Sequence, residues 1–451
     1  MKTRYISGLL FVVIAALPYA LMVVTGRHNV EPAAAKPETL VIISPHRREV
    51  RLEYSRAFRA WMKDRHNRAV EISWVDVGGT QKINKYLESQ FSASADGIGV
   101  DLLFGGGVSP YLVARRNGWL QSVDLPPGTL DNIPALCAGL QVYDPEHYWH
   151  GVALSGFGIV YNRTVLRRLG LSVPLTWEDL AAPAFFTWLA SGDPRSSGSV
   201  HKCYEIILQA YGFEKGWGII TRICANVHRF GEGGGAAPLE TAMRDVAAGM
   251  AIDQYAETVV RLVGRDVLGF VLPADVTVMD ADAIGLLRGA PSPELARTFI
   301  EFALSEEGQQ VLYQPAGVNG QQFALNRMPV RKSCYDTPGG PAARPYEQGS
   351  GLKFDARKES ARRDIVAAMI GVFMIDAHSE LAAAWKRVIA DGMRPDDVSR
   401  LCKPPVAESD LLVLSKLWGD PREKARISAE WSAVARRRYR AIEQGSGETR
   451  Q

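Results

Sequence analysis

Continuous apolar runs alternate with amphipathic stretches along the first part of the chain. The apolar runs at residues 39–44, 70–75 and 100–104 predict buried strands. The stretches at residues 83–91 and 110–117 have the apolar spacing of helices. Strands that alternate with helices in this way favour right-handed βαβ units on a mainly parallel sheet, so the pattern predicts an α/β fold. The loops after the three strands would then share the sheet edge at which open α/β sheets bind ligands.

A second set of strand and helix patterns begins near residue 150. It predicts strands at residues 158–161, 185–190, 227–230, 250–253, 267–272 and 276–279, and a helix at residues 237–248. A further strand at residues 282–287 leads back towards the first region. Helical patterns at residues 293–303 and 306–313 follow it.

A loop rich in Ser and Gly at residues 192–199 leads into a predicted helix. The helix face is formed by Tyr204, Ile207, Leu208 and Tyr211. The Ser hydroxyls suit a helix N-cap, and the first turn of a helix carries unpaired N–H groups and a partial positive charge. An anion can bind there, with Arg195 as a charged clamp. The alternative is that the Ser and Gly residues only make a turn and cap the helix.

The chain after residue 352 is helical in pattern. A polar stretch rich in Pro and Gly, residues 334–351, separates it from the α/β part. The apolar stripes are Ile365, Met369, Val372 and Phe373; Leu381, Trp385, Val388 and Ile389; and Ile427, Trp431, Val434 and Ile442. We therefore predict a C-terminal helical extension of residues 352–451. Its stripes should pack on a lobe or on a partner, because exposed Trp and Ile would aggregate.

The N-terminus has the pattern of an export signal. A short basic segment precedes an almost wholly apolar run at residues 6–24. The run exceeds the usual signal core of about 7–15 residues and approaches the roughly 20 residues that span a bilayer. Residues 1–30 are therefore predicted to be a signal peptide or an N-terminal membrane anchor. Both alternatives place the body of the protein outside the cytoplasm.

Composition narrows the classes of function. The 451 residues are 47% hydrophobic and 22% charged, which is typical of a globular protein of two or three domains. A net charge of +3 and the lack of basic runs with interleaved aromatics argue against nucleic-acid binding. The five Cys lack zinc-site spacing, and their pairing stays open. Because no Gly-x-Ser-x-Gly, His-Glu-x-x-His or Walker motif is present, we expect neither an enzyme nor a resident cofactor.

Seven segments together carry a resemblance to a known family. They are LVIISPH (40–46), GVDLLFGG (99–106), WHGVAL (149–154), VYN (160–162), TWEDL (176–180), GDPRSSGS (192–199) and LSEEGQ (304–309). With these segments in this order, the chain resembles the extracytoplasmic substrate-binding proteins of ABC importers, in the branch that includes ferric-iron-binding proteins. The resemblance implies a two-lobed periplasmic-binding-protein fold of type II with the ligand in the cleft. Residues 39–145 with 282–330 would form lobe 1, and residues 150–281 lobe 2.

The resemblance also implies a ligand set. Iron-binding members hold Fe(III) with one His, one Glu and two adjacent Tyr, together with a small anion. Here His46 and Tyr255 match two of these positions, but Ala256 stands at the second Tyr and Gly105–Gly107 at the Glu. Fe(III) prefers anionic oxygen donors, so His46 with one Tyr is a poor cage. We therefore expect a small anionic ligand, organic or phosphate-bearing, with ferric iron or an iron–anion complex as the alternative.

The predicted function is the extracytoplasmic solute-binding component of an ABC transporter. Ligand contacts are expected from His46, Arg47, Gly79, Thr80, Gly106, Gly107, Ser155, Asp193, Arg195, Ser196, Ser197, Gly198, Ser199 and Tyr255. His46 and Tyr255 would be metal ligands only if iron is bound. A cleft with many donors and few acidic groups should select an anion. The expected partners of the periplasmic monomer are a permease and an ATPase, and a ligand sensor with the same fold is the further alternative.

Overall fold

The computed structural model describes residues 37–273, 276–347 and 352–445. Residues 1–30, where a signal peptide or membrane anchor is predicted, lie outside the described residues. The strands are β1 Glu38–Ile43, β2 Val70–Val75, β3 Leu102–Phe104, β4 Leu120–Gln121, β5 Leu136–Cys137, β6 Leu140–Gln141, β7 His150–Asn162, β8 Leu189–Gly192, β9 Val227–Gly231, β10 Ala248–Ile252, β11 Leu268–Val271, β12 Met279–Leu287 and β13 Met328–Pro329. The helices are α2 Arg48–His66, α3 Thr80–Ala93, α4 Ser109–Arg116, α5 Arg163–Leu169, α6 Gly198–Tyr211, α7 Phe213–Asn226, α8 Ala236–Met243, α9 Asp253–Val263, α10 Pro293–Leu304, α11 Glu306–Gln310, α12 Ala356–Ile370, α13 His378–Ala390, α14 Pro395–Leu401, α15 Leu411–Leu417 and α16 Pro421–Glu443.

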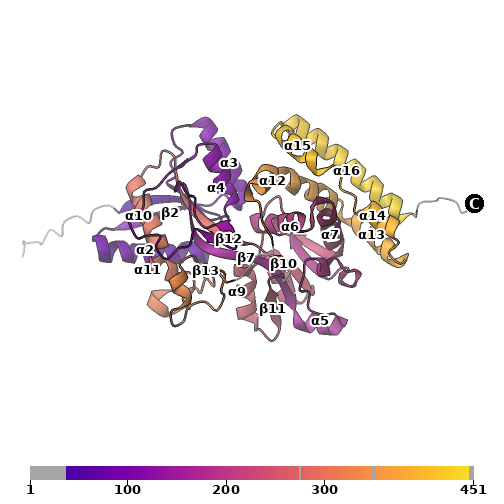
Figure 1. Ribbon diagram of the computed structural model, residues 1–451, viewed down its shortest axis with the longest axis horizontal. Coiled ribbons are helices and arrows are strands. Elements are labelled where there is room, and N and C mark those ends of the chain that lie inside the picture. Colours follow the sequence, from indigo (N-terminus) through magenta and orange to yellow (C-terminus); the bar gives the residue numbers. More distant parts are fainter. Residues whose placement is uncertain (1–36, 274–275, 348–351, 446–451) are drawn as a thin grey trace, which may run out of the picture.

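One sheet runs through both halves of the molecule, in the order β2-β1-β3-β12-β7-β10-β8-β9. Strand β1 pairs in parallel with β2 and β3, as the alternating pattern predicts. Strands β7 and β12 pair antiparallel in the middle of this order and join the two halves (Figure 1). The predicted strand at residues 158–161 is only the second half of β7, which is buried along its whole length.

The fold has two hydrophobic cores, one on each side of the β7–β12 pair. The first core draws on residues 40–154 and 279–335, and the second on residues 157–278 and 354–442. Strand β7 contributes Leu154 to the first core and Phe157 to the second. In Figure 1, α2, α3, α4, α10 and α11 surround the first core, and α5 to α9 lie on the side of the second. The expected two-lobed α/β fold is confirmed, and below "lobe 1" and "lobe 2" mean these two cores with their helices.

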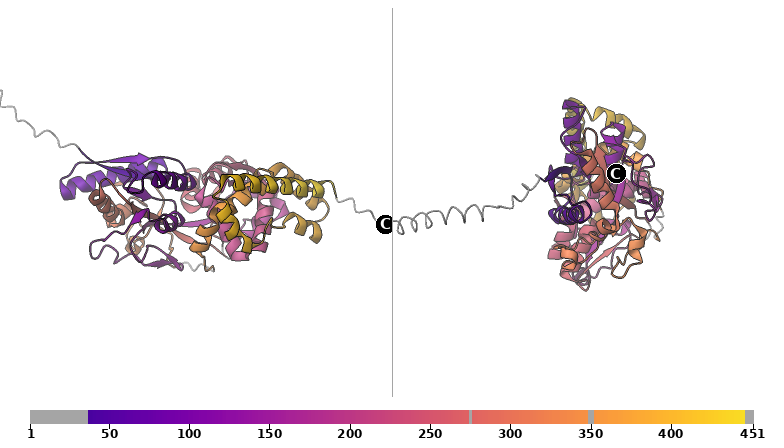
Figure 2. Two further views of the ribbon diagram at one scale, coloured as in Figure 1. Left: turned by 90° about the horizontal axis from the view of Figure 1, so that it is seen from above. Right: turned by 90° about the vertical axis from the view of Figure 1, so that its left-hand side faces the viewer.

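The C-terminal helices pack against lobe 2. Met369, Trp385 and Trp431 belong to the second core together with residues of α6 and α7. Helix α12 lies beside α6 and close to α4 of lobe 1, α13 and α14 lie on the outer side of lobe 2, and α16 runs along the surface of lobe 2 (Figures 1 and 2). Apart from Val434, which is 41% exposed, and Ile389, which is partly buried, the stripes that the sequence predicts are buried against a lobe of the same chain. Burial of large aromatic side chains of this kind is a major source of folding free energy.

Three local predictions are wrong. The predicted strand at residues 276–279 contributes only Met279 to a strand, because Met279 begins β12. The predicted helix at residues 237–248 ends at Met243, where Arg244 takes a left-handed conformation. The predicted strand at residues 185–190 begins only at Leu189, after a short 3-10 turn that starts with Pro183.

Two further findings concern cysteines and membrane spans. All five cysteines are free thiols, and only Cys402 is partly exposed. Within the described ranges, no single helix is long and apolar enough to cross a membrane; residues 356–375 with α13 pass that test of length and composition only as a pair bent by 65°.

Candidate functional site

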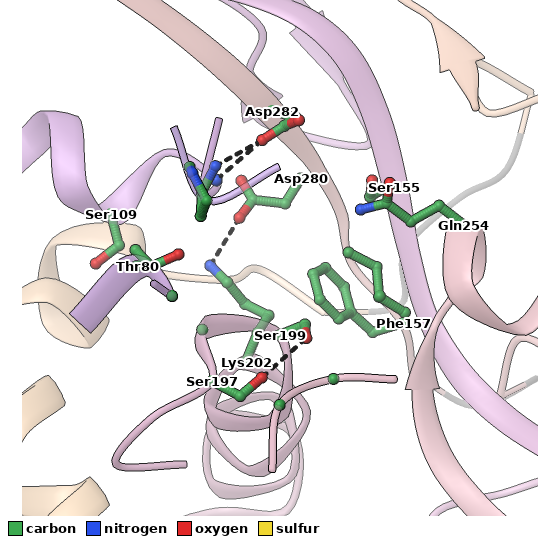
Figure 3. Close-up of a pocket in the computed structure, with 18 of the residues that line it drawn as sticks. Thr80, Ser109, Ser155, Phe157, Ser197, Ser199, Lys202, Gln254, Asp280 and Asp282 are labelled. Carbon is green, nitrogen blue, oxygen red and sulfur yellow. Dashed lines mark hydrogen bonds and ion pairs between the residues drawn. The ribbon is translucent and has the colours of Figure 1, made fainter. Parts of the chain in front are cut away.

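A cavity of about 260 Å³ lies between the two lobes. This volume is slightly below the usual range for small-molecule sites, about 300–1,000 Å³, so the cavity suits a small solute. The sequence-predicted residues that line it are His46, Gly79, Thr80, Gly106, Gly107, Ser155, Ser196, Ser197, Gly198, Ser199 and Tyr255. Figure 3 shows Thr80 and Ser109 on one side of the cavity, and Ser155, Phe157 and Gln254 on another.

Four helices begin at the cavity wall. Thr80 starts α3, Ser109 starts α4 and Gly198 starts α6, while Gln254 is the second residue of α9. The first N–H groups of a helix have no partner within the helix, and they lie at the positive end of its dipole. Because two of these helices come from lobe 1 and two from lobe 2, closure of the lobes brings four positive helix ends to one small space.

The Ser-rich loop is built as the sequence predicts. Strand β8 ends at Gly192, and the carbonyl of Asp193 accepts hydrogen bonds from the N–H groups of Ser196 and Ser197. Ser197 is the N-cap of α6 and accepts a weak 3.4 Å bond from the N–H of Val200. The turn and the helix cap, which the alternative interpretation of this loop expects, are therefore present. The loop nevertheless faces the cavity with Ser196 to Ser199.

The glycine turn after β3 is already occupied by a side chain of the protein. Gly105, Gly106 and Gly107 all have positive φ, between 78° and 99°, which favours glycine at each position. The N–H groups of Gly106 and Gly107 donate to Oδ1 of Asp282 at 2.8 and 3.3 Å. A Cβ on Gly105 would lie 2.7 Å from the ring of His46. The turn thus holds Asp282 and makes room for His46.

His46 is held by Asp282 and is uncharged. Its Nε2 lies 2.7 Å from Oδ2 of Asp282, which also pairs with Arg327. Burial lowers the pKa of His46 despite the opposing effect of the carboxylate. For Asp282, burial alone would raise the pKa, but Arg327 and His46 outweigh it and hold that pKa well below its ordinary value.

The protonation of His46 follows from this pairing. Nη1 of Arg327 also lies 3.1 Å from Nε2, but the shorter 2.7 Å contact with the Asp282 carboxylate requires Nε2 to donate, which leaves Nδ1 of the neutral imidazole as an acceptor. This Nδ1 is buried and has no partner among the described residues, so it can accept a hydrogen bond from a ligand hydroxyl.

A second buried ion-pair network lines the cavity at α6. Nζ of Lys202 lies 2.9 Å from Oδ2 of Asp280 on β12 (Figure 3). It also pairs with Glu359 on α12. Burial opposes the charge of Lys202, yet Asp280 and Glu359 raise its pKa above the ordinary value. The expectation of few acidic groups is therefore wrong, because Asp280 and Asp282 both line the cavity. Both carboxylates are neutralised by buried cations.

Arg363 of α12 also reaches the cavity. Its side chain is 5% exposed, and its Nη1 pairs with Glu359 at 3.1 Å. Its Nε and Nη2 are buried without a hydrogen-bond partner in the described part of the chain. A Cβ on Gly198 would lie 3.1 Å from Nη2, which puts the guanidinium against the N-terminus of α6.

Three of the predicted contact residues do not line the cavity: Arg47, Asp193 and Arg195. Arg195 is bound by two carboxylates, with its Nε and Nη2 on Asp193 and its Nη1 and Nη2 on Asp376. Burial opposes this charge, but the two carboxylates raise the pKa of Arg195 above its ordinary value. The expectation that Arg195 clamps a ligand is not met, because it fastens the loop to the C-terminal helices.

The lobes are in contact across the mouth of the cavity. A Cβ on Gly79 in lobe 1 would lie 2.6 Å from the carbonyl oxygen of Ser196 in lobe 2. Arg47 in lobe 1 stacks its guanidinium 3.9 Å from the centre of the Tyr255 ring in lobe 2. The two lobes therefore touch on both sides of the cavity mouth.

Sequence reasoning missed Lys202, Asp280, Asp282 and Arg363. A signal existed for the two aspartates, since residues i and i+2 of a strand face one side and carboxylates are rare in an apolar strand. Lys202 follows Ser199 by three residues and so lies near it on α6. Nothing local links Arg363 to the Ser-rich loop.

The donors present do not form an evident metal site. Among the described residues, no group of three or more His, Cys, Asp or Glu side chains is placed to hold a metal ion. Of the two suggested iron ligands, His46 is engaged by Asp282 and Tyr255 is stacked against the cationic Arg47.

Residues 108–326 match the family model described as bacterial extracellular solute-binding protein. The phosphoglycerate transport regulatory protein PgtC of Salmonella typhimurium is 28% identical over 185 residues, 41% of this chain and 45% of PgtC. An uncharacterized protein of Haemophilus influenzae is 25% identical over 172 residues, 37% of this chain and 48% of that protein. The chain thus spans about half the length of the curated relatives it matches.

Solved structures share the fold. The periplasmic binding protein AfuA of Actinobacillus pleuropneumoniae, with fructose-6-phosphate bound, superposes with a TM-score of 0.59 at 20% identity, over 76% of this chain and 99% of AfuA. Iron-bound HitA of Pseudomonas aeruginosa superposes with a TM-score of 0.56 at 18% identity, over 73% of this chain and 99% of HitA. At these identities the likeness establishes the architecture and leaves the ligand open.

Proposed function

We propose that the chain, whose residues 108–326 match the family model of bacterial extracellular solute-binding proteins, binds a small phosphate-bearing anion between its lobes and delivers it to an ABC importer. The observation that carries the proposal is the convergence of four helix N-termini on one cavity of about 260 Å³. Helix N-termini favour negative charge, and closure of the lobes excludes water, which strengthens each contact.

The polar groups around the cavity suit the rest of such a ligand. Nδ1 of His46 and Oγ of Ser155 are buried and lack partners in the described residues. Asp280 and Gln254 add further acceptors and donors. A phosphate ester of a small polyol or hydroxy acid carries hydroxyl groups that match these atoms. The names of PgtC and of the AfuA complex, which mention phosphoglycerate and fructose-6-phosphate, point in the same direction.

Titration calorimetry on the full chain tests the proposal. Probes would be 3-phosphoglycerate, fructose 6-phosphate and inorganic phosphate, with glycerate and fructose as unphosphorylated controls. We expect saturable binding of at least one phosphate ester and none of its control. The same ester should also raise the melting temperature, since a ligand at about a hundred times its Kd adds about 2.7 kcal/mol to the free energy of unfolding. Binding of the controls alone would reject a phosphate-directed site.

Ferric iron is the second candidate ligand, because His46 and Tyr255 both line the cavity and HitA has the same fold. The pairing of His46 with Asp282 and the Arg47 charge beside Tyr255 make the cavity better suited to an anion. Ferric citrate belongs in the same set of titrations, with citrate alone as its control.

We further propose that the protein works in the periplasm with a permease and an ATPase, after export by residues 1–30, which either are removed or remain as an anchor. A ligand sensor is the alternative, and the word "regulatory" in the name of PgtC favours testing it. Uptake of the labelled phosphate ester by cells with and without the gene separates the two. Loss of uptake supports transport, whereas unchanged uptake with altered expression of transport genes supports sensing.

A further inference from the structure

We propose that Arg363, which the C-terminal helix α12 brings to the cavity, binds the phosphate group of the solute together with the N-terminus of α6. This inference rests on the proposed function and names the residue that completes its anion site. Arg363 lies outside residues 108–326, the part of the chain that matches the solute-binding family. The binding site would therefore depend on the C-terminal helices as well as on the two lobes.

The first argument is the unsatisfied edge of the guanidinium. Nε and Nη2 of Arg363 are buried and have no hydrogen-bond partner among the described residues. A buried polar group without a partner destabilises the folded state, and more strongly when it is charged. Nearly all buried polar groups in proteins are hydrogen-bonded, so two free nitrogens on one residue call for a partner. The cavity beside them is where a ligand would supply it.

The second argument is which nitrogens are free. Nε and Nη2 form one edge of the guanidinium, and two parallel N–H groups on such an edge match two oxygens of a phosphate. The remaining nitrogen, Nη1, pairs with Glu359 at 3.1 Å. Glu359 also pairs with Lys202, which in turn pairs with Asp280. This network holds Arg363 in place while its free edge stays available.

The third argument is position. Nη2 of Arg363 lies 3.1 Å from the place that a Cβ on Gly198 would take, and Oγ1 of Thr80 lies equally near that place. Gly198 is the first residue of α6, and Thr80 is the first residue of α3. The free edge of Arg363 therefore lies beside the first residues of two helices, so a phosphate that enters from the cavity would meet the guanidinium and both positive helix ends.

Arg195 provides a matched control on the same loop. It is also an arginine near α6, but its Nε, Nη1 and Nη2 all contact carboxylates of Asp193 or Asp376. It has no free edge and does not line the cavity.

The test compares Arg363→Gln, Arg363→Lys and Arg195→Gln by calorimetry with 3-phosphoglycerate and fructose 6-phosphate on the full chain. We expect Arg363→Gln to raise the Kd of the ester roughly 10- to 150-fold, the range for a lost charged hydrogen bond. Arg363→Lys keeps the positive charge but lacks the two parallel N–H groups, so its affinity should lie between those of wild type and Arg363→Gln. Arg195→Gln should stay within about twofold of wild type, since it loses no ligand contact.

Other readouts separate this inference from a structural role and from the proposed function. The ligand-free melting temperature of Arg363→Lys should stay close to that of wild type, because Lys keeps the positive charge beside Glu359, whereas Arg363→Gln leaves Glu359 and Asp280 with Lys202 as their shared cation and should lower it. If Arg363→Gln does not fold, the Lys variant carries the test. If both Arg363 variants bind the ester with wild-type affinity, the inference is overturned but the proposed function stands. Absence of binding by wild type to every phosphate probe overturns both.

Discussion

Nε1 of Trp385 donates a 2.8 Å hydrogen bond to Oδ1 of Asn226, and both side chains are fully buried. The bond joins α13 of the C-terminal helices to the end of α7 in lobe 2. The amide of Asn226 also donates to the carbonyls of Leu180 and Ala182, so one side chain ties three segments together. The C-terminal helices are therefore integrated into lobe 2 by polar as well as apolar contacts.

Loss of this bond should destabilise the protein. Trp385→Phe keeps a large aromatic side chain but leaves Oδ1 of Asn226 buried without a donor. We expect the free energy of unfolding in urea to fall by at least about 1–3 kcal/mol, the cost of an unsatisfied buried acceptor, with more from the smaller ring. Trp418→Phe serves as control, because Trp418 is only partly buried and stacks on Trp431. Equal losses in the two variants would contradict a special role for the bond.

Gly79 should control how far the lobes close. Its φ of −70° suits any residue, so an Ala side chain meets no backbone strain there. The added Cβ would, however, lie 2.6 Å from the carbonyl oxygen of Ser196 in the other lobe. We expect Gly79→Ala to cost the closed state about 1–3 kcal/mol, which corresponds to roughly 5- to 150-fold weaker ligand binding.

Two measurements test this prediction. Calorimetry gives the affinity for the phosphate ester that binds wild type, and small-angle X-ray scattering of the same complex gives its radius of gyration. The scattering should report a larger radius of gyration for the liganded variant. Gly419→Ala is the control, since the nearest atom to its added Cβ would be 3.6 Å away. Wild-type affinity and wild-type radius in Gly79→Ala would show that the contact does not limit closure.

The sequence predicts those parts of the fold that depend on local pattern. Strand β2 is found at the predicted residues 70–75, and the Ser-rich loop precedes a helix as expected. The predicted length of strand β7 is too short, because its first half belongs to one core and its second half to the other. No local sequence pattern indicates that a strand passes from one core to the next.

The sequence identifies residues that line the cavity where they adjoin strand ends or helix starts, and it misses those that distant charged segments bring there. Arg195 has the right residue type next to the right loop, but Asp193 and Asp376 occupy it. Arg363 has no local sign of a binding role, since only packing of α12 against α6 brings it to the cavity. Charge pairing between distant segments is decided by tertiary structure, which sequence periodicity does not encode.

Acid should destabilise the protein through His150. This side chain is 1% exposed, and burial with the neighbouring His147 lowers its pKa to about 3. The unfolded chain, with a His pKa near 6.5, binds the proton more readily than the folded one between these values. The free energy of unfolding should therefore fall by about 1.4 kcal/mol for each pH unit below about 6.5 on account of this residue, until pH approaches about 3.

Urea unfolding at a series of pH values, for wild type and His150→Gln, measures this contribution. The variant should lose less stability per pH unit below about 6.5 by the amount given above. His228→Gln is the control, because the side chain of His228 is exposed. Parallel pH profiles for wild type and His150→Gln would exclude His150 as a source of acid sensitivity.

Tyr255 distinguishes an anion site from an iron site. The guanidinium of Arg47 lies 3.9 Å from the ring centre, so a ferric ion on the phenolate would lie near a fixed positive charge. We expect wild type, incubated with ferric citrate and then desalted, to retain substoichiometric iron and to show no visible absorption from a phenolate–iron bond. Tyr255→Phe should bind the phosphate ester within a few-fold of wild type, because it keeps the ring on which Arg47 stacks. Stoichiometric iron that is lost in Tyr255→Phe would instead assign the cavity to ferric iron, with His46 released from Asp282 as a second ligand.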